Sequence, residues 1–189
     1  GNTAFASMSA VYEGLSDRWQ RFFSGLEAVH DFKPFRSLFP TDADGIEKLR
    51  RFEDRYPAVT HPVVSVHPIT GKKVIFVNPQ FTLHIKGMAE DESRMILDML
   101  YRKTLIHEYQ YRHCWEPNMV VFWDNRHVQH SALHDYYPQR RLMERVTIAG
   151  TRPVAADPAA GTGTLQLQAF MNSSGSVGTG LFSSLACSA

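Results

Sequence analysis

The sequence predicts a mainly β fold with a few helices, of the antiparallel sandwich or jelly-roll class. Short runs rich in valine and aromatic residues alternate with tight turns, and residues at helical spacing are confined to three segments. The chain has 189 residues, which is enough for one domain with its own hydrophobic core.

Apolar residues from Ser9 to Leu26 recur at spacings of three and four, which predicts one amphipathic helix or two short ones. Ser16 is placed to cap the second helix, with Trp19 to Phe23 on its buried side. Residues 30–42 contain two prolines and several aromatic residues and are expected to form a loop. Residues 44–55 are predicted to form a highly charged helix.

The period then changes to that of β-structure. The run HPVVSVHP, the turn ITGK and the run KVIFVN predict a hairpin. A helix is predicted from Glu90 to Arg102, with Met95, Ile96, Met99 and Leu100 as its buried stripe. Further strands are predicted at 108–115, 119–123, 127–133 and 141–149. In the first of these, Tyr109, Tyr111, His113 and Trp115 share one face.

Composition excludes several classes of protein. Twenty Lys and Arg against nineteen Asp and Glu give a net charge of +1, which argues against a nucleic-acid binder. No apolar run is long enough to span a membrane, and the first residues lack the pattern of a signal peptide. Two distant cysteines, Cys114 and Cys187, exclude a disulfide framework. These features favour a cytoplasmic enzyme.

The last segment has a different composition. From residue 153 to residue 189 the chain is rich in Gly, Ser, Thr and Ala and carries little charge. Such a composition buries too little apolar surface to offset chain entropy, so this tail is predicted to be disordered. The predicted folded domain is residues 1–152.

The segment 122–150 concentrates the residues suited to chemistry. His130 and His134 are four apart, but no Glu follows the first His as in a zinc HExxH site, so a zinc pair is not favoured. Arg141 and Arg145 share a face of the predicted strand. They would either bind a carboxylate or another oxyanion inside the fold, or form salt bridges at its rim.

Four stretches carry a family resemblance. These are GNTAF at residues 1–5, HPVVSVHPITGKKVIFVNPQFT at 61–82, RHCWEPNMVVFWDNRHVQHSALHDYYPQRR at 112–141, and ERVTIAG at 144–150. In this order and spacing the chain resembles the taurine dioxygenase family of iron(II)- and 2-oxoglutarate-dependent oxygenases. The resemblance implies a double-stranded β-helix, or jelly roll, that holds Fe(II) in a facial triad of two His and one carboxylate. 2-Oxoglutarate would be the cosubstrate.

The resemblance also implies roles for individual residues. His130 aligns with the distal iron-ligating His, and Arg141 and Thr3 align with the residues that bind the far carboxylate of 2-oxoglutarate. Arg145 aligns with a contact to the substrate sulfonate, and Phe81 with an aromatic wall of the substrate pocket. His127 has the opposite parity to His130 in an extended strand, so only one of them can face the site. His61, His67 and His113 are expected to be structural.

One motif of the family is missing from the chain. The first two iron ligands of the family form an H-x-D motif that precedes the G-N-T stretch, and no H-x-D occurs in this sequence. We therefore expect a jelly roll truncated at its amino terminus, with one iron ligand and no activity by itself.

The leading functional hypothesis is an Fe(II)/2-oxoglutarate dioxygenase that uses O₂ to hydroxylate a small anionic substrate. This substrate is taurine or another sulfonate, a sulfate ester or a carboxylate, and neither nucleic acid nor membrane is an expected partner. The alternative is a non-catalytic jelly-roll remnant that binds a small anion or a protein. Dimers or tetramers are common among similar enzymes, which leaves a homo-oligomer open.

Overall fold

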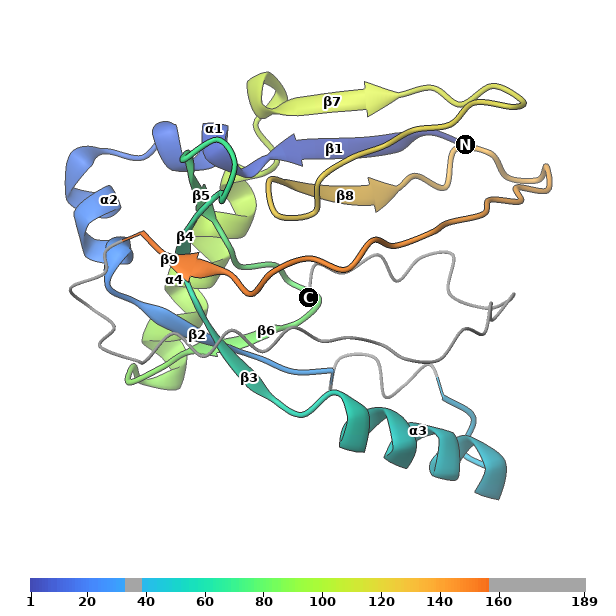
Figure 1. The fold of residues 1–189 in the computed structure, drawn as a ribbon, viewed down its shortest axis with the longest axis horizontal. Helices are drawn as coiled ribbons and strands as arrows, with labels where there is room; N and C mark the ends of the chain where they lie inside the picture. The colour runs from blue at the N-terminus through green and yellow to red at the C-terminus, as the bar shows by residue number, and fades with distance from the viewer. Residues whose placement is uncertain (33–38, 157–189) are drawn as a thin grey trace.

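The structure is a computed structural model that describes residues 1–32 and 39–156. Within these residues the strands form three antiparallel sheets of three strands each, in the orders β7-β1-β8, β3-β2-β6 and β5-β4-β9. Figure 1 shows the first sheet at one end of the molecule and the other two sheets, with helix α4, at the other end. The predicted mainly β fold with helices is confirmed.

The first sheet is built around the start of the chain. Its strands are β1 (Thr3–Ser7), β7 (Gln110–His113) and β8 (Val128–Ala132). Strand β1 lies between the other two, so residues separated by more than 100 positions in the sequence become neighbours. The strand predicted at 127–133 is confirmed as β8. The strand predicted at 108–115 is shorter, because residues His107–Tyr109 form a 3-10 turn.

The predicted hairpin is confirmed, but its first run is divided between two sheets. Strand β4 (Val64–Val66) pairs with β5 (Lys73–Ile75), while β3 (Val59–Pro62) pairs with β2 (Glu27–His30). Strand β6 (Thr82–Ile85) completes the β2 sheet. Strands β2 and β6 are additions to the sequence prediction. They are only four residues long, and their neighbours are distant in sequence, so local periodicity gives little signal for them.

The amino-terminal helical segment forms the two short helices of the second alternative, α1 (Met8–Glu13) and α2 (Asp17–Ser24). Ser16 is the N-cap residue of α2, but its side chain makes no capping hydrogen bond. The prediction that Trp19 to Phe23 form the buried side is wrong in part. Phe23 is fully buried, whereas Trp19 and Phe22 are 40% and 44% exposed, because α2 contacts the core only through Phe23 and packs its other two rings against it near the surface.

The two charged helices form as predicted, as α3 (Ala43–Arg55) and α4 (Glu90–Lys103). Acidic residues in the first turn of α4 and basic residues in its last turn complement the helix dipole. Its buried stripe differs by one position from the prediction, since Leu97 is buried with Ile96 and Leu100 while Met95 is 67% exposed. Helix α4 is fixed to β6 where the Ser93 hydroxyl accepts a hydrogen bond from the Ile85 amide at 2.7 Å.

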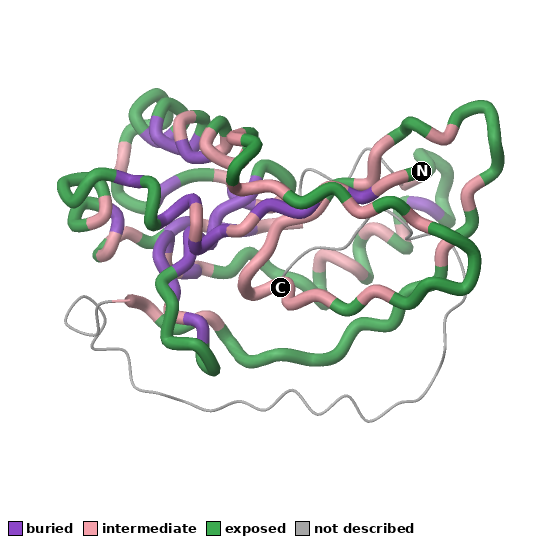
Figure 2. The backbone as a smooth tube through the Cα atoms, turned by 90° about the horizontal axis from the view of Figure 1, so that it is seen from above, coloured by how far each residue is buried: buried purple, intermediate pink, exposed green. Residues whose placement is uncertain are grey.

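The hydrophobic core lies between α1, α4 and the β3-β2-β6 and β5-β4-β9 sheets. Figure 2 shows buried backbone gathered at that end of the molecule, with exposed and intermediate residues along much of the rest. The core consists of Met8, Val11, Tyr12, Leu15, Phe23, Ala28, Val63, Val64, Val74, Ile75, Val77, Ile85, Ile96, Leu97 and Leu100. The β7-β1-β8 sheet therefore extends away from the end of the molecule that contains the hydrophobic core.

Two predicted strands do not form. Residues 119–123 and 141–149 have no strand hydrogen bonding in the structure, although the first run is continuously apolar and the second contains the sequence Val-Thr-Ile, which is typical of strands. Val120 and Val146 are 94% and 92% exposed. A strand needs a hydrogen-bonded neighbour, and within residues 1–32 and 39–156 neither run has one. The prediction that Arg141 and Arg145 share a strand face is thus wrong.

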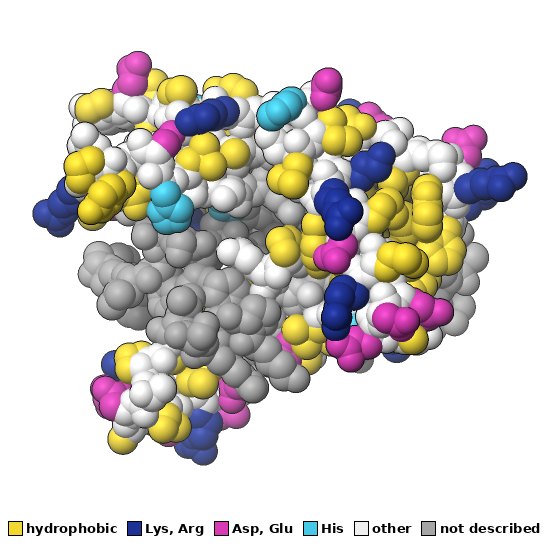
Figure 3. Space-filling model, turned by 180° about the vertical axis from the view of Figure 1, so that it is seen from behind, with side chains coloured by type: hydrophobic (Ala, Val, Ile, Leu, Met, Phe, Trp, Pro, Cys, Tyr) yellow, Lys and Arg dark blue, Asp and Glu magenta, His cyan; other side chains and the backbone are white. Residues whose placement is uncertain are grey.

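The predicted boundary at residue 152 falls just before strand β9 (Val154–Ala155), which pairs with β4. The predicted tail is therefore ordered at its beginning, and residues 157–189 lie outside the described residues, as do 33–38 of the predicted loop. Among the helices of the described residues, none combines the length and the apolar character that crossing a bilayer requires. Figure 3 shows acidic and basic side chains interspersed on the rear face.

Candidate functional site

One face of the β1 sheet gathers the residues that the sequence singled out. Thr3 and Phe5 lie two positions apart on β1 and so point to the same side of the sheet. Thr3 is paired with His113 of β7, and Phe5 is paired with His130 of β8. Directly opposite residues in an antiparallel pair project to the same face. We call this face, carrying Thr3, Phe5, His113 and His130, the site face.

His130 is held on the site face by aromatic rings. Its imidazole lies 5.0 Å from the Trp123 ring and 6.0 Å from the Phe5 ring, measured between centroids. Burial lowers the pKa of His130 below its usual value, and the positive charge of Arg145 lowers it further. The imidazole is therefore neutral at pH 7, which is the form that ligates a metal ion. The charge of Arg145 thus acts on His130 although the predicted strand does not form.

The structure brings Thr3 and Arg141 together across 138 positions of sequence. The Arg141 Nη2 atom donates to the Thr3 hydroxyl at 3.4 Å, and the indole nitrogen of Trp115 donates to the same oxygen at 2.9 Å. The Arg141 guanidinium also lies 5.8 Å from the Tyr136 ring centroid. Thr3 is 5% exposed, so this is a preformed polar cluster on the site face.

The hydrogen-bonding capacity of this cluster is incompletely used. A hydroxyl oxygen accepts two hydrogen bonds and donates one. Because Arg141 and Trp115 fill the acceptor positions of Thr3, the Thr3 hydrogen points away from both. The Arg141 Nε atom is buried and has no hydrogen-bond partner within the described residues. A buried donor without a partner is unfavourable, and a carboxylate is the group that would accept from both Arg141 and Thr3.

Phe81 is fixed in a different part of the fold. It immediately precedes β6, where its amide donates to the Asn78 side chain at 2.9 Å and its carbonyl accepts from the Asp31 amide at 2.8 Å. These bonds hold Phe81 beside the β3-β2-β6 sheet. Its role as a wall of the substrate pocket stays a prediction.

A complete metal centre is not formed by this part of the chain. Within residues 1–32 and 39–156, no three His, Cys, Asp or Glu side chains lie close enough together to hold a metal ion. His130 is a single candidate ligand. The described residues therefore fit the far carboxylate of a dicarboxylate but do not complete an iron site.

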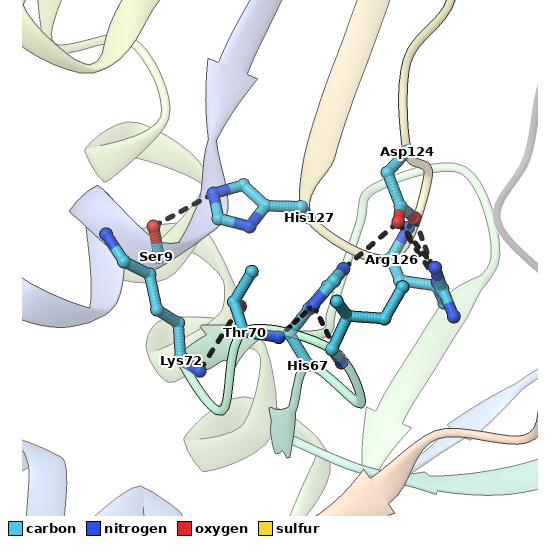
Figure 4. A network of polar contacts seen from close by, with 8 residues as sticks. Ser9, His67, Thr70, Lys72, Asp124, Arg126 and His127 are labelled. Atoms are coloured by element: carbon cyan, nitrogen blue, oxygen red, sulfur yellow. Dashed lines mark hydrogen bonds and ion pairs between the residues drawn. The ribbon is translucent and has the colours of Figure 1, made fainter.

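A second polar cluster joins the β4–β5 turn to the segment before β8 (Figure 4). The His67 Nδ1 atom accepts from the Thr70 amide at 3.1 Å, so the ring proton is on Nε2, which donates to Asp124 at 3.0 Å. Asp124 also accepts from the Arg126 guanidinium at 2.7 Å. This hydrogen bond from Arg126, more than that from His67, holds the pKa of the Asp124 carboxyl well below its usual range. We call His67, Asp124 and Arg126 the inter-sheet clamp.

His127 faces the clamp and not the site face. Its Nε2 atom lies 3.0 Å from the Ser9 hydroxyl, and its ring packs edge-on against His67 at 5.7 Å between centroids. Burial, followed by the neighbouring His67 and Lys72, lowers the pKa of His127. The sequence argument that His127 and His130 face different sides agrees with this arrangement. Asp124, Arg126 and Ser9 were missed as structural partners, since sequence periodicity carries no signal for such a clamp.

A third histidine cluster lies inside the β3-β2-β6 sheet. His30 and His61 are 5% and 9% exposed, and their ring centroids are 5.1 Å apart. Burial lowers the pKa of each to about 4, helped by the partner His61 at His30 and by Arg152 at His61. The expectation that His61 and His67 are structural agrees with their surroundings. The same expectation for His113 stays a prediction; His113 lies on the site face, paired with Thr3.

Comparison with known proteins gives a consistent assignment. A sequence model described as "Taurine catabolism dioxygenase TauD, TfdA family" matches residues 1–147. An alpha-ketoglutarate-dependent sulfonate dioxygenase of Saccharomyces cerevisiae is 36% identical over 82% of this chain and 36% of its own length. An alpha-ketoglutarate-dependent sulfate ester dioxygenase of Pseudomonas putida is 35% identical over 83% of this chain and 53% of its own length.

A crystal structure of a taurine dioxygenase from Burkholderia xenovorans superposes with a TM-score of 0.59 and 31% identity, over 73% of this chain and 42% of that one. The chain thus spans about half, or less, of the length of the relatives it matches. The likeness identifies the described sheets as part of a jelly-roll fold.

Proposed function

The chain belongs to the taurine dioxygenase (TauD, TfdA) family, and on that basis we propose that it acts as part of an iron(II)- and 2-oxoglutarate-dependent dioxygenase. The proposed reaction consumes 2-oxoglutarate, O₂ and a small anionic substrate, and yields succinate, CO₂ and the hydroxylated substrate. The relatives that act on sulfonates and sulfate esters support an alkylsulfonate or sulfate ester as the substrate. Hydroxylation beside a sulfonate would release sulfite and an aldehyde.

The observation that carries this proposal is the Thr3–Arg141 pair on the same face as His130. The guanidinium is a planar two-pronged donor, and its buried Nε atom lacks a partner in the described residues. Thr3 accepts from Arg141 and Trp115 and keeps its own hydrogen available. Together they would bind and orient the far carboxylate of 2-oxoglutarate. When bound, 2-oxoglutarate would supply two electrons as its C1 carboxylate is lost as CO₂.

The other residues have separate proposed tasks. His130, kept neutral by burial, would supply one imidazole ligand to iron. Arg145, whose charge acts on His130, would attract the anionic group of the primary substrate. Since the described residues hold a single candidate ligand, we propose that an H-x-D segment elsewhere in the natural polypeptide supplies the other two.

The test separates Arg141 from Arg145 in a polypeptide that also carries the H-x-D segment. Arg141→Lys keeps the charge but loses the planar fork, and should raise the concentration of 2-oxoglutarate needed for half-maximal succinate formation about tenfold or more, since a charge-assisted hydrogen bond contributes roughly 1.5–3 kcal/mol. Arg145→Ala should raise the requirement for the sulfonate or sulfate ester and leave uncoupled succinate formation largely intact.

Steady-state succinate formation against each substrate in turn measures both effects. The reverse pattern would exchange the roles of the two arginines. If neither variant changes either requirement, the assigned site is wrong. A non-catalytic remnant that binds an anion predicts no succinate at all from the longer polypeptide, and the dioxygenase names of the matched relatives do not favour it.

A further inference from the structure

We propose that His113 is a third hydrogen-bond donor in the carboxylate site, acting beside Arg141 and Thr3 on the far carboxylate of the dicarboxylate cosubstrate. This inference rests on the proposed function. It adds a binding residue that the sequence interpretation treated as structural.

The register of the β1 sheet places His113 beside Thr3. The two residues are direct partners across the β1–β7 pair, so their side chains project to the same face. Thr3 is at the same time paired with Ala132 of β8, whose side chain is too small to reach over it. Of the two cross-strand neighbours of Thr3, His113 is the one whose side chain carries a hydrogen-bonding group.

The ring of His113 has one nitrogen in use and one unused. The Tyr111 hydroxyl lies 3.4 Å from Nδ1, while Nε2 is buried and has no hydrogen-bond partner within the described residues. If the tyrosine donates to Nδ1, the ring proton is on Nε2. His113 then presents a buried N–H group on the side of the sheet where Arg141 presents its unpartnered Nε–H.

Trp115 fixes the relative positions of His113 and Thr3. Its ring lies 4.7 Å from the His113 ring at an interplanar angle of 89°, and its indole nitrogen donates to Thr3. One side chain thus contacts both proposed donors and limits the rotation of each. The sequence prediction placed Tyr111, His113 and Trp115 on one face but gave no indication that Thr3 lies across from them.

The chemistry of the three donors selects an anion with two oxygens. A carboxylate accepts about four hydrogen bonds, and the Arg141 fork, the Thr3 hydroxyl and the His113 N–H together offer that number. A ring nitrogen that is buried without a partner is unfavourable, and it gains a hydrogen-bond partner when the anion binds. We therefore expect His113 to increase affinity for 2-oxoglutarate without contacting the primary substrate.

The experiment uses the 189-residue chain with ¹⁵N-labelled histidines and 2-oxoglutarate as the probe. Two-bond ¹H–¹⁵N spectra report each ring nitrogen, and addition of 2-oxoglutarate should shift the Nε2 resonance of His113 saturably. His113→Phe, which keeps a ring and removes the donor, should raise the dissociation constant about tenfold. His113→Gln, which restores an N–H group, should recover most of the affinity. His84→Gln, an exposed histidine on β6, is the matched control and should bind as the unmodified chain does.

The outcomes separate this inference from the proposed function. If Arg141→Gln abolishes binding while His113→Phe binds normally and the Nε2 resonance stays fixed, His113 is not a donor, its N–H faces the Trp115 ring, and the carboxylate site stands. If Arg141→Gln and His113→Phe both bind normally, both proposals are overturned. If the chain shows no saturable binding, the inference about His113 is overturned, whereas the proposed function is decided by succinate formation in the polypeptide that carries the H-x-D segment. Loss of binding in His113→Phe with no recovery in His113→Gln assigns the ring to packing alone and also overturns the inference.

Discussion

The site face and the inter-sheet clamp use the same residue types in opposite ways. In the clamp, both nitrogens of His67 have partners, and Asp124 accepts from His67 and Arg126. On the site face, His113 and Arg141 each retain a buried nitrogen without a partner in the described residues. A satisfied polar cluster stabilises the fold, whereas an unsatisfied one has capacity left for a ligand.

The His30–His61 pair limits this rule. Both histidines also have an unpartnered buried nitrogen, His30 Nε2 and His61 Nδ1. Their neighbour, however, is the aromatic ring of Phe76, and the guanidinium of Arg152, whose charge acts on His61, donates instead to the Thr60 carbonyl. A buried nitrogen without a partner therefore indicates a ligand-binding site where several donors suited to an anion lie together. Elsewhere it indicates a core group that resists protonation.

The largest effect we expect is a loss of folding stability in acid, caused by the His30–His61 pair. Both histidines have a pKa near 6.5 when unfolded and about 4 when folded, so the unfolded chain binds more protons between these values. Stability is complete above pH 6.5 and falls as the pH is lowered towards 4, by about 3 kcal/mol for each histidine. His127 and His130 shift in the same direction.

Urea unfolding at a series of pH values measures this loss. His30→Leu should remove about half of the contribution from the pair, and His84→Gln, exposed on the same sheet, is the matched control. An unchanged slope between pH 6.5 and 4 in His30→Leu would show that His30 is not protonated on unfolding, and would contradict the assignment.

The clamp gives the next largest effect. Asp124→Asn removes the charge that Arg126 binds and weakens the acceptor of the His67 N–H, so the free energy of unfolding should fall by about 2 kcal/mol, the size expected for hydrogen bonds to a charged group. Glu47→Gln is the control, since Glu47 also bonds two arginines but lies on the exposed face of α3. Urea unfolding at pH 7 compares them. Equal losses would mean that the clamp is an ordinary surface salt bridge.

Sequence periodicity predicted the elements whose signal is local. The hairpin 61–78, helix α4 and strand β8 follow from apolar spacing and turn residues, and the buried stripe of α4 was displaced by only one residue. The runs 119–123 and 141–149 have the apolar and β-branched residues typical of strands but no hydrogen-bonded neighbour in the described residues. Pairing between distant segments decides whether such a run becomes a strand, and periodicity does not contain that information.

The site was predicted through the family resemblance more than through the residue pattern. The resemblance placed Thr3, His130 and Arg141 together, and the structure puts Thr3 within hydrogen-bonding distance of Arg141 and on the same face as His130. His113 was missed because its significance depends on the β1–β7 register. An alternating run identifies which residues share a face, but it cannot identify what lies across from them.

Substitution of Thr3 should have the smallest effect on stability and gives the most direct test of the difference between the site face and the clamp. Thr3→Val keeps the shape of the side chain but leaves the Trp115 and Arg141 donors without their acceptor, which should cost about 1 kcal/mol of unfolding free energy. The same change should weaken 2-oxoglutarate binding about tenfold, and Thr3→Ser should restore both, because the serine hydroxyl repeats the hydrogen bonds. Urea unfolding and a 2-oxoglutarate titration of the three chains measure the two quantities. A loss of stability as large as that of Asp124→Asn, with unchanged binding, would make the site face a second structural cluster and remove the distinction between the two regions.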